Sequence, residues 1–165
     1  MYPIVLEYDD AISSDDLEIM LDIASNGPET QWAEMNDVAE TGEFWLNKRM
    51  LIHDHVLPSW HQKIVELRSE IDFSNITEPR KIQRFGPKDY LGPLADAEHV
   101  PSIRYGTILF INEPAGAEIY FPNLNYKVSA KSNKLVVYPS NEPYKISGPS
   151  KEKYLYFSTV FLSSE

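Results

Sequence analysis

The sequence predicts one α+β domain in which helices in the first half brace one sheet of a sandwich or jelly-roll barrel formed by the second half. The chain has 165 residues, of which 42% are hydrophobic, enough for one buried core and too few for two ordinary domains. Up to about residue 71 apolar residues recur at helical spacing, whereas after Pro79 they alternate along short runs rich in β-branched and aromatic residues. Helices followed by many short strands are typical of this architecture. The single domain, 1–165, therefore divides into helical support over about 13–71 and a sheet core over about 80–162.

The first half contains signals for two helices and a marginal third. Ser13 or Ser14 caps the first helix, which ends at Asn26-Gly27-Pro28, and the second begins near Leu57. The polar stretch 29–43 has weak periodicity and predicts a loop or a marginal helix. Apolar residues lie on one side of each main helix: Leu17, Met20, Leu21 and Ile23 in the first, and Trp60, Ile64, Leu67 and Ile71 in the second.

Short strands account for most of the second half. In the last strand Tyr156 and Val160 face one way while Leu155 and Phe157 face the other, so both faces are largely apolar. A strand of this kind is covered on both sides or lines a barrel interior. The predicted strands are Ile4 to Tyr8, Lys81 to Phe85, Ile103 to Ile111, Glu118 to Phe121, Tyr126 to Val128, Lys134 to Tyr138 and Tyr154 to Phe161.

The composition excludes several classes of function. A formal net charge of -10 would repel a phosphate backbone, so nucleic acid is not an expected partner. The chain has no cysteine, which rules out disulfides, a thiolate nucleophile and cysteine-bound metal centres. No apolar run approaches the roughly 18 residues that span a bilayer, and residues 1–10 lack a signal-peptide pattern. Neither membrane association nor secretion is expected, and the cytoplasm is the default compartment.

Four segments of the second half occur in a characteristic order. They read IQRFGPKDYLGPLAD, IRYGTILFINEPAGAEIYFP, KLVVYPSNEPYKISG and KEKYLYFSTVF. Their most specific features are the turn at Gly116-Ala117-Glu118 and the strand end at Tyr138-Pro139-Ser140. In this order the segments resemble the small iron(II)- and 2-oxoglutarate-dependent oxygenases of the prolyl-4-hydroxylase type, especially short members encoded by bacteriophages. The resemblance implies a double-stranded β-helix (jelly-roll) core braced by two or three N-terminal helices.

The resemblance also implies where a metal site would lie. In such oxygenases a His-x-Asp motif on one strand and a histidine on a later strand hold the iron and leave three coordination positions open. The first motif falls at Leu94-Ala95-Asp96, so that only Asp96 matches. The later histidine falls at Lys145, to within one or two residues. The basic residue that binds the far carboxylate of 2-oxoglutarate corresponds to Lys153, and Tyr105 is a candidate to line the same pocket.

The residues at these positions argue against iron binding. Leu94 offers no lone pair, and at an effective dielectric near 20 a doubly charged ion about 4 Å from the Lys145 ammonium is repelled by roughly 8 kcal/mol. No metal or other cofactor is therefore expected, and Asp96 is the candidate ligand if any metal binds. Instead, Lys145 and Asp96 are expected to form a salt bridge at the place of the ion.

The remaining histidines are alternative metal ligands. His53-Asp54-His55 would place two imidazoles on one face of a strand, but it precedes a helix start and no third ligand is near it in the sequence. His99 lies in a loop beside Pro101, and His61 lies within the second helix. Exposed positions are the simplest interpretation of both, and no metal site is expected at any of these histidines.

Three functions follow from these observations. The first is a non-catalytic oxygenase-fold protein that acts as a binding or structural and assembly module, because the strand and turn pattern persists while both histidines are absent. Its partner would be another protein, such as a phage structural protein, in the host cytoplasm or in the virion. The alternative is a dioxygenase that uses iron(II) and 2-oxoglutarate to hydroxylate prolyl residues, with an atypical ligand set around Asp96. The third is a sensor of small carboxylates that relies on Lys153.

Overall fold

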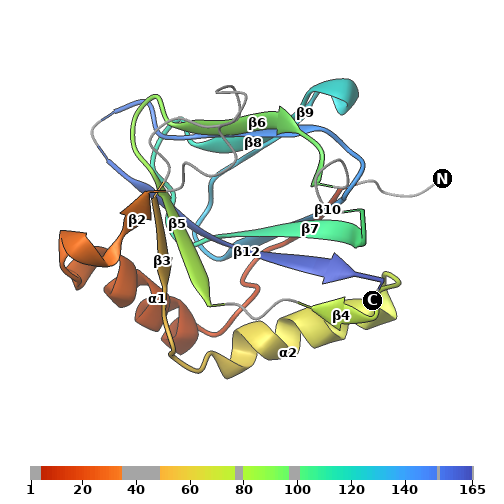
Figure 1. Cartoon of the computed structure of the whole chain (residues 1–165), viewed down its shortest axis with the longest axis horizontal. Helices are drawn as coiled ribbons and strands as arrows, with labels where there is room; N and C mark the ends of the chain where they lie inside the picture. Colours follow the sequence, from red (N-terminus) through yellow and green to blue (C-terminus); the bar gives the residue numbers. More distant parts are fainter. Residues whose placement is uncertain (1–4, 35–48, 77–79, 97–100, 152, 165) are drawn as a thin grey trace.

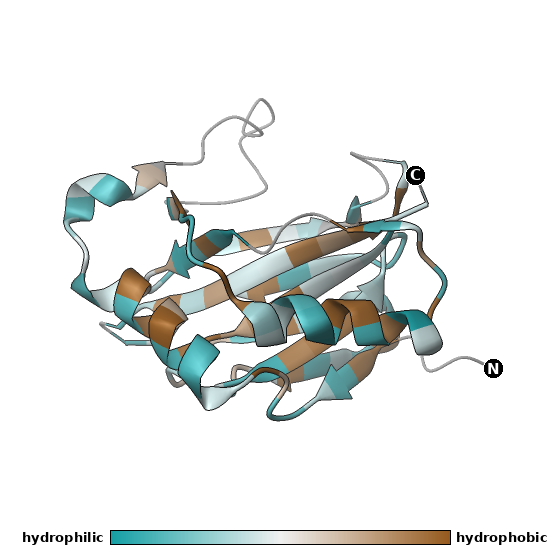
Figure 2. Ribbon diagram, turned by 90° about the horizontal axis from the view of Figure 1, so that it is seen from below, coloured by the Kyte–Doolittle hydropathy of each residue, from teal (hydrophilic) through white to brown (hydrophobic). Residues whose placement is uncertain are grey.

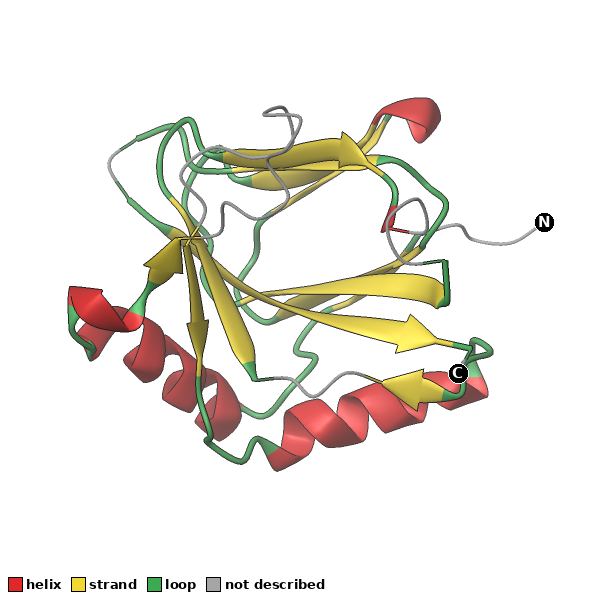
Figure 3. Cartoon of the chain, viewed as in Figure 1, coloured by secondary structure: helices red, strands yellow, loops and turns green. Residues whose placement is uncertain are grey.

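Two antiparallel sheets face each other, and two α-helices cover the outer face of the larger sheet (Figure 1). The computed structural model describes residues 5–34, 49–76, 80–96, 101–151 and 153–164. The helices are α1 (Ser14–Asn26) and α2 (Pro58–Glu66), and they lie together on one side of the molecule (Figure 3). No helix in these ranges is long and apolar enough to cross a membrane.

The two sheets differ in size. The larger sheet has the order β1 (Leu6–Tyr8), β10 (Lys134–Pro139), β7 (Ile103–Phe110), β12 (Leu155–Ser163), β5 (Lys81–Phe85), β3 (Arg49–Ile52) and β2 (Ala33–Glu34), with β4 (Asn75–Ile76) paired to β12. The smaller sheet has the order β6 (Tyr90–Leu94), β11 (Tyr144–Ser147), β8 (Glu118–Phe121) and β9 (Tyr126–Ser129). From β5 onward the chain passes repeatedly from one sheet to the other, which makes the core a jelly roll.

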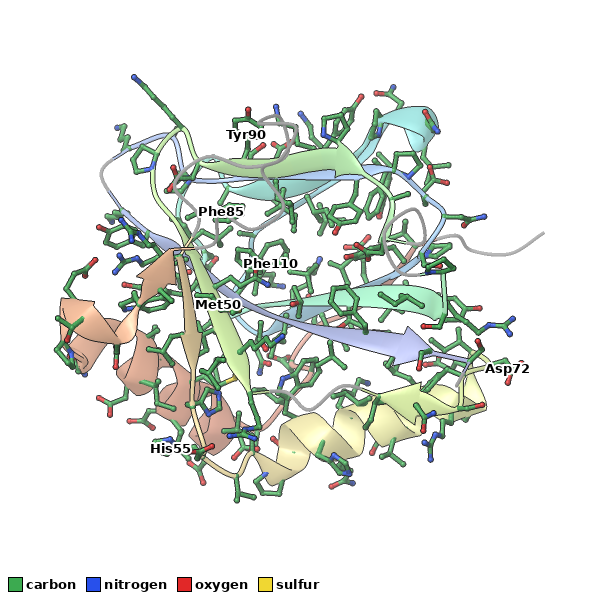
Figure 4. All side chains as sticks on the ribbon, viewed as in Figure 1. Met50, His55, Asp72, Phe85, Tyr90 and Phe110 are labelled. Carbon is green, nitrogen blue, oxygen red and sulfur yellow. The ribbon has the colours of Figure 1, made fainter. Side chains whose placement is uncertain are left out.

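The central strand β12 explains how two cores form from one chain. Leu155 and Phe157 face the space between the sheets, while Val160 and Leu162 face the helices, as predicted from the alternation of side chains. Figure 4 shows Phe85 and Phe110 between the two sheets, and both side chains are fully buried. We call the cluster between the sheets the barrel interior and the cluster beneath the helices the helix-facing core.

Local signals placed the helices correctly. The Ser13 side chain accepts a hydrogen bond from Asp16 N at 3.1 Å and so caps α1. Both helices carry hydrophobic and hydrophilic residues in alternation along their length (Figure 2), and Met20, Trp60 and Ile64 are completely buried beneath them. The marginal third helix is not confirmed, because the described part of 29–43 contains only the 3-10 turn η1 (Glu29–Gln31) and strand β2. Residues 35–43 lie outside the described ranges.

Five strands were not predicted: β2, β3, β4, β6 and β11. Each has five residues or fewer, and β6 contains Gly92-Pro93, residues that sequence patterns associate with turns. These strands are defined by pairing with distant segments; Leu94 of β6, for example, pairs with Tyr144 of β11. The two strands that carry the candidate site, β6 and β11, are among them.

Candidate functional site

The positions implied for an iron site converge where β6 and β11 lie side by side. Leu94 is the last residue of β6, and Asp96 follows two residues later with 6% of its surface exposed. Leu94 is the backbone partner of Tyr144, the first residue of β11. The Tyr144 phenol donates a hydrogen bond to Asp96 Oδ1 at 2.6 Å. The residue that faces Asp96 from the later strand is therefore Tyr144.

This geometry corrects the expectation for Lys145. Successive side chains of a strand point to opposite faces, so the neighbour of the inward-facing Tyr144 points away from the barrel interior. Lys145 is half-buried, and its ammonium lies 5.1 Å from the centre of the Tyr90 ring. No ion pair joins Lys145 to Asp96 within the described ranges, so the predicted salt bridge is wrong.

A second tyrosine completes the cluster around Asp96. Tyr138 of β10 is 1% exposed, and its ring centre lies 4.8 Å from that of Tyr144. The Tyr144 phenol is hydrogen-bonded to the Asp96 carboxylate, and Tyr138 lies beside the pair. Burial raises the pKa of Tyr138 and of Tyr144 well above the ordinary value, and the nearby Asp96 charge raises both further. Both phenols therefore stay protonated and remain hydrogen-bond donors.

Gly106 provides the space for this cluster. It lies on β7 opposite Tyr138, and a Cβ atom at this position would lie 2.5 Å from both Asp96 Oδ2 and the Tyr138 ring. Carbon and oxygen atoms in ordinary contact are separated by more than about 3 Å. Any larger residue would have to displace the aspartate or the tyrosine.

We expect Gly106→Ala to lower the free energy of unfolding by about 1–3 kcal/mol, the usual cost of an overpacked core. Urea denaturation followed by circular dichroism would measure it. Ser129→Ala, at an exposed position of β9, is the control and should change stability by less than about 0.5 kcal/mol. A Gly106→Ala variant as stable as the control would contradict the packing described.

The described residues do not fit an iron ion with 2-oxoglutarate. Of the three implied ligand positions, one is Leu94 and one falls at or next to Lys145, where Tyr144 presents a protonated phenol. The third, Asp96, already accepts that phenol's hydrogen bond. Aromatic and aliphatic side chains fill the barrel interior, among them Phe110, Phe121 and Phe157, all fully buried. In the described part of the chain, no three His, Asp or Glu side chains are arranged to hold a metal.

The structure does not bring the predicted carboxylate-binding residues to this place. Lys153 is exposed and precedes β12, and the first residue of that strand to face the barrel interior is Leu155. Tyr105 packs against the helix-facing core, on the opposite side of β7 from the barrel interior. Neither residue therefore lines a pocket with Asp96. The sensor function that relied on Lys153 has no support from this geometry.

A buried arginine is a feature that the sequence did not reveal. Arg84 of β5 is 6% exposed and lies between the rings of Trp32 and Tyr154, at 4.7 and 4.3 Å from their centres. Its Nη1 donates to Glu29 Oε2 at 3.0 Å and its Nη2 donates to Oε1, a bidentate pair. These residues come from three separate segments, so no local pattern could have grouped them. The cluster attaches η1 to the edge of the barrel.

The Glu29–Arg84 pair should make stability depend on pH. The pKa of Glu29 is lowered from 4.5, chiefly by its hydrogen bond with Arg84. The stabilisation is therefore complete above pH 4.5 and is lost as the pH falls through the lower pKa of the folded state. We expect Glu29→Gln to be less stable than the unmodified chain at pH 7 and equally stable at low pH. Thermal unfolding across this range is the measurement, and a pH-independent difference would contradict the role assigned to the pair.

The histidines lie apart from the barrel interior. His53 is buried, and its pKa is lowered by burial first and then by the charges of His55 and Arg80. His55 and His61 are exposed, as expected for His61. His99 lies outside the described ranges. None of the three described histidines can replace the ligands missing beside Asp96 without a rearrangement of the barrel.

Comparison with known proteins identifies the fold. No protein-family model matches the sequence, and no curated protein matches it. Among solved structures, a prolyl-4-hydroxylase from Pseudomonas putida covers 98% of this chain and 93% of its own, with 11% identity and a TM-score of 0.71. The Trichoplax adhaerens prolyl hydroxylase, in complex with a hypoxia inducible factor peptide fragment, covers 98% and 84%, with 10% identity and a TM-score of 0.72.

A third similar structure is the viral collagen prolyl hydroxylase of Paramecium Bursaria Chlorella virus-1 in complex with 2-oxoglutarate. It covers 98% of this chain and 97% of its own, with 13% identity and a TM-score of 0.64. The chain therefore has the fold of the prolyl-4-hydroxylase-like 2-oxoglutarate and iron(II) oxygenases. This confirms the jelly-roll fold and the structural resemblance expected from the sequence.

Proposed function

We propose that this chain is a non-catalytic protein with the oxygenase fold, which acts as a binding or assembly module. The observation that carries the proposal is the hydrogen bond from Tyr144 to Asp96, 2.6 Å long, at the place where the sequence resemblance implies an iron site. An oxygenase of this type needs open coordination positions for its cosubstrates. Here a phenol is bound to the carboxylate, and apolar side chains fill the barrel interior around it.

The energetics support the same proposal. To admit a metal, the protein would have to withdraw the hydrogen bond of Tyr144 from a buried carboxylate, and a hydrogen bond to a charged group contributes about 1.5–3 kcal/mol. It would also have to move fully buried aromatic side chains to make room for 2-oxoglutarate. The metal would recover only one protein ligand, Asp96, from the three implied positions.

The partner in this proposal is another protein, bound by the outer surface. A net charge of -10 favours a partner with a basic surface and disfavours nucleic acid. The sequence resemblance to phage-encoded members suggests a phage structural protein as partner, in the host cytoplasm or in the virion. Mass spectrometry of purified particles would detect the chain if it is a virion component, and its absence from them would exclude that location.

Anaerobic titration with iron(II) and 2-oxoglutarate tests the absence of catalysis. An active oxygenase gives a visible charge-transfer band when both are bound, and it forms succinate when oxygen and a prolyl peptide are added. We expect neither signal. A band together with succinate would establish the alternative, a prolyl hydroxylase with an atypical metal site around Asp96.

A further inference from the structure

A short segment between β3 and α2 holds two histidines in a fixed backbone. His53 N donates to Arg80 O at 3.0 Å, and Arg80 Nε donates to His53 O at 3.1 Å. The Arg80 guanidinium also pairs with the Asp54 carboxylate. At the other end of the segment, Leu57 is buried with 4% of its surface exposed. The segment is thus attached at both ends, although it belongs to no helix or strand.

The His53 ring lacks the partners that a buried imidazole normally has. It is 6% exposed, and neither Nδ1 nor Nε2 has a hydrogen-bond partner among the described residues. An imidazole carries a donor or an acceptor at each nitrogen, and buried polar groups without a partner are uncommon in native proteins. Such a group commonly indicates an ion, a ligand or an ordered water that completes the site.

This ring lines a pocket of about 470 Å³ on the outside of the barrel. The aliphatic side chains of Ile23, Leu51 and Ile52 form part of the lining, and His53 and His55 are also among the lining residues. Figure 4 shows His55 near α1, far from the aromatic residues between the sheets. The two imidazole centres are 5.9 Å apart with an angle of 60° between the rings. The pocket is therefore separate from the cluster around Asp96.

We propose that His53 and His55 bind one divalent transition-metal ion of the zinc class in this pocket. Two imidazoles that bind one tetrahedral ion at about 2.0–2.1 Å have centres about 5 Å apart. The centres of the His53 and His55 rings are 5.9 Å apart in the structure. A small rotation of the exposed His55 side chain would bring them to the distance that a shared ion requires. Imidazole ligands suit zinc, nickel and copper, and the chain has no cysteine to compete for them.

The charges near the pocket are compatible with a cation. Arg80 is a positive group close enough to lower the pKa of His53, and its guanidinium pairs with the Asp54 carboxylate. Asp54 is therefore not counted as a ligand, and the ion keeps positions for water or for a donor atom from a bound molecule. The sequence did not predict this site because no third ligand lies nearby. The inference rests on the buried ring nitrogens of His53 and on the pocket.

Isothermal titration of the untagged protein with Zn²⁺ and with Ni²⁺ tests this site. We expect saturable 1:1 binding that is lost in His55→Ala, because the exposed position allows the variant to fold. His61→Ala, an exposed histidine of α2, is the matched control and should bind as the unmodified chain does. Absence of saturable binding, binding that persists in His55→Ala, or an equal loss in His61→Ala would each overturn the proposal.

Discussion

The double variant Leu94→His/Tyr144→His should bind Co²⁺ or Fe²⁺ beside Asp96, where the unmodified chain should not. Leu94 and Tyr144 are backbone partners on adjacent strands, and Tyr144 reaches Asp96 within 2.6 Å. Replacing the phenol with an imidazole removes the hydrogen-bond donor and provides a metal ligand in its place. Together with Asp96, the two new histidines supply the two-histidine, one-carboxylate set that holds non-haem iron.

Visible absorption of bound Co²⁺ would measure this gain of binding. The variants are best made with His55→Ala, so that the pocket at His53 and His55 does not contribute to the signal. The matched control is Leu94→His/Lys145→His, which differs only in the strand position that receives the second histidine. Because Lys145 faces away from the barrel interior, this control should bind no metal there. Stronger binding by the control than by the Tyr144 variant would contradict the assignment.

Replacing Tyr144 itself should destabilise the protein severely. The side chain is 3% exposed and packs against Tyr138 in the barrel interior. Truncation of a buried aromatic residue to alanine costs about 3–5 kcal/mol, and here the Asp96 carboxylate also loses a hydrogen-bond donor. For a chain of this length each kcal/mol lowers the melting temperature by about 2–4 °C. Tyr144→Ala should therefore lower it by roughly 6–20 °C.

The neighbouring residue provides the control for this experiment. Lys145→Ala changes an outward-facing side chain and should alter stability by less than about 1 kcal/mol. Tyr144→Phe keeps the ring and removes only the hydroxyl, so it should fall between the two, at a loss of about 1.5–3 kcal/mol. Calorimetry of the three variants would test the order. Equal losses for Lys145→Ala and Tyr144→Ala would show that the faces of β11 are assigned wrongly.

The fold was predictable where short-range patterns determine it. The Ser13 cap, the apolar sides of α1 and α2, and the alternation along β12 all depend on residues within one element. Strands β6 and β11 were not predictable in this way, because each has five residues or fewer and is defined by a partner about 50 residues distant. The family resemblance implied a site at these segments, although the sequence pattern did not indicate them as strands.

For the implied metal site, the structure tests the expected salt bridge between Lys145 and Asp96, and that expectation was wrong. The residue that faces Asp96 from β11 is Tyr144, the neighbour of Lys145. A shift of one residue in a strand moves a side chain to the opposite face. An ion pair between Lys145 and Asp96 was predicted, whereas the structure has a hydrogen bond from the Tyr144 phenol to the Asp96 carboxylate. The cluster of Arg84, Trp32 and Tyr154 was not predictable, since it joins three distant segments.

A crystal structure of the protein grown with Mn²⁺ and 2-oxoglutarate would test the central claim most directly. Mn²⁺ scatters anomalously and prefers the oxygen ligands that an oxygenase site offers, so a bound ion would give a peak beside Asp96. We predict no such peak and no 2-oxoglutarate between the sheets, with the Tyr144 hydroxyl within hydrogen-bond distance of Asp96 Oδ1. A manganese peak within about 2.5 Å of the Asp96 carboxylate, with Tyr144 displaced, would contradict the proposed non-catalytic function.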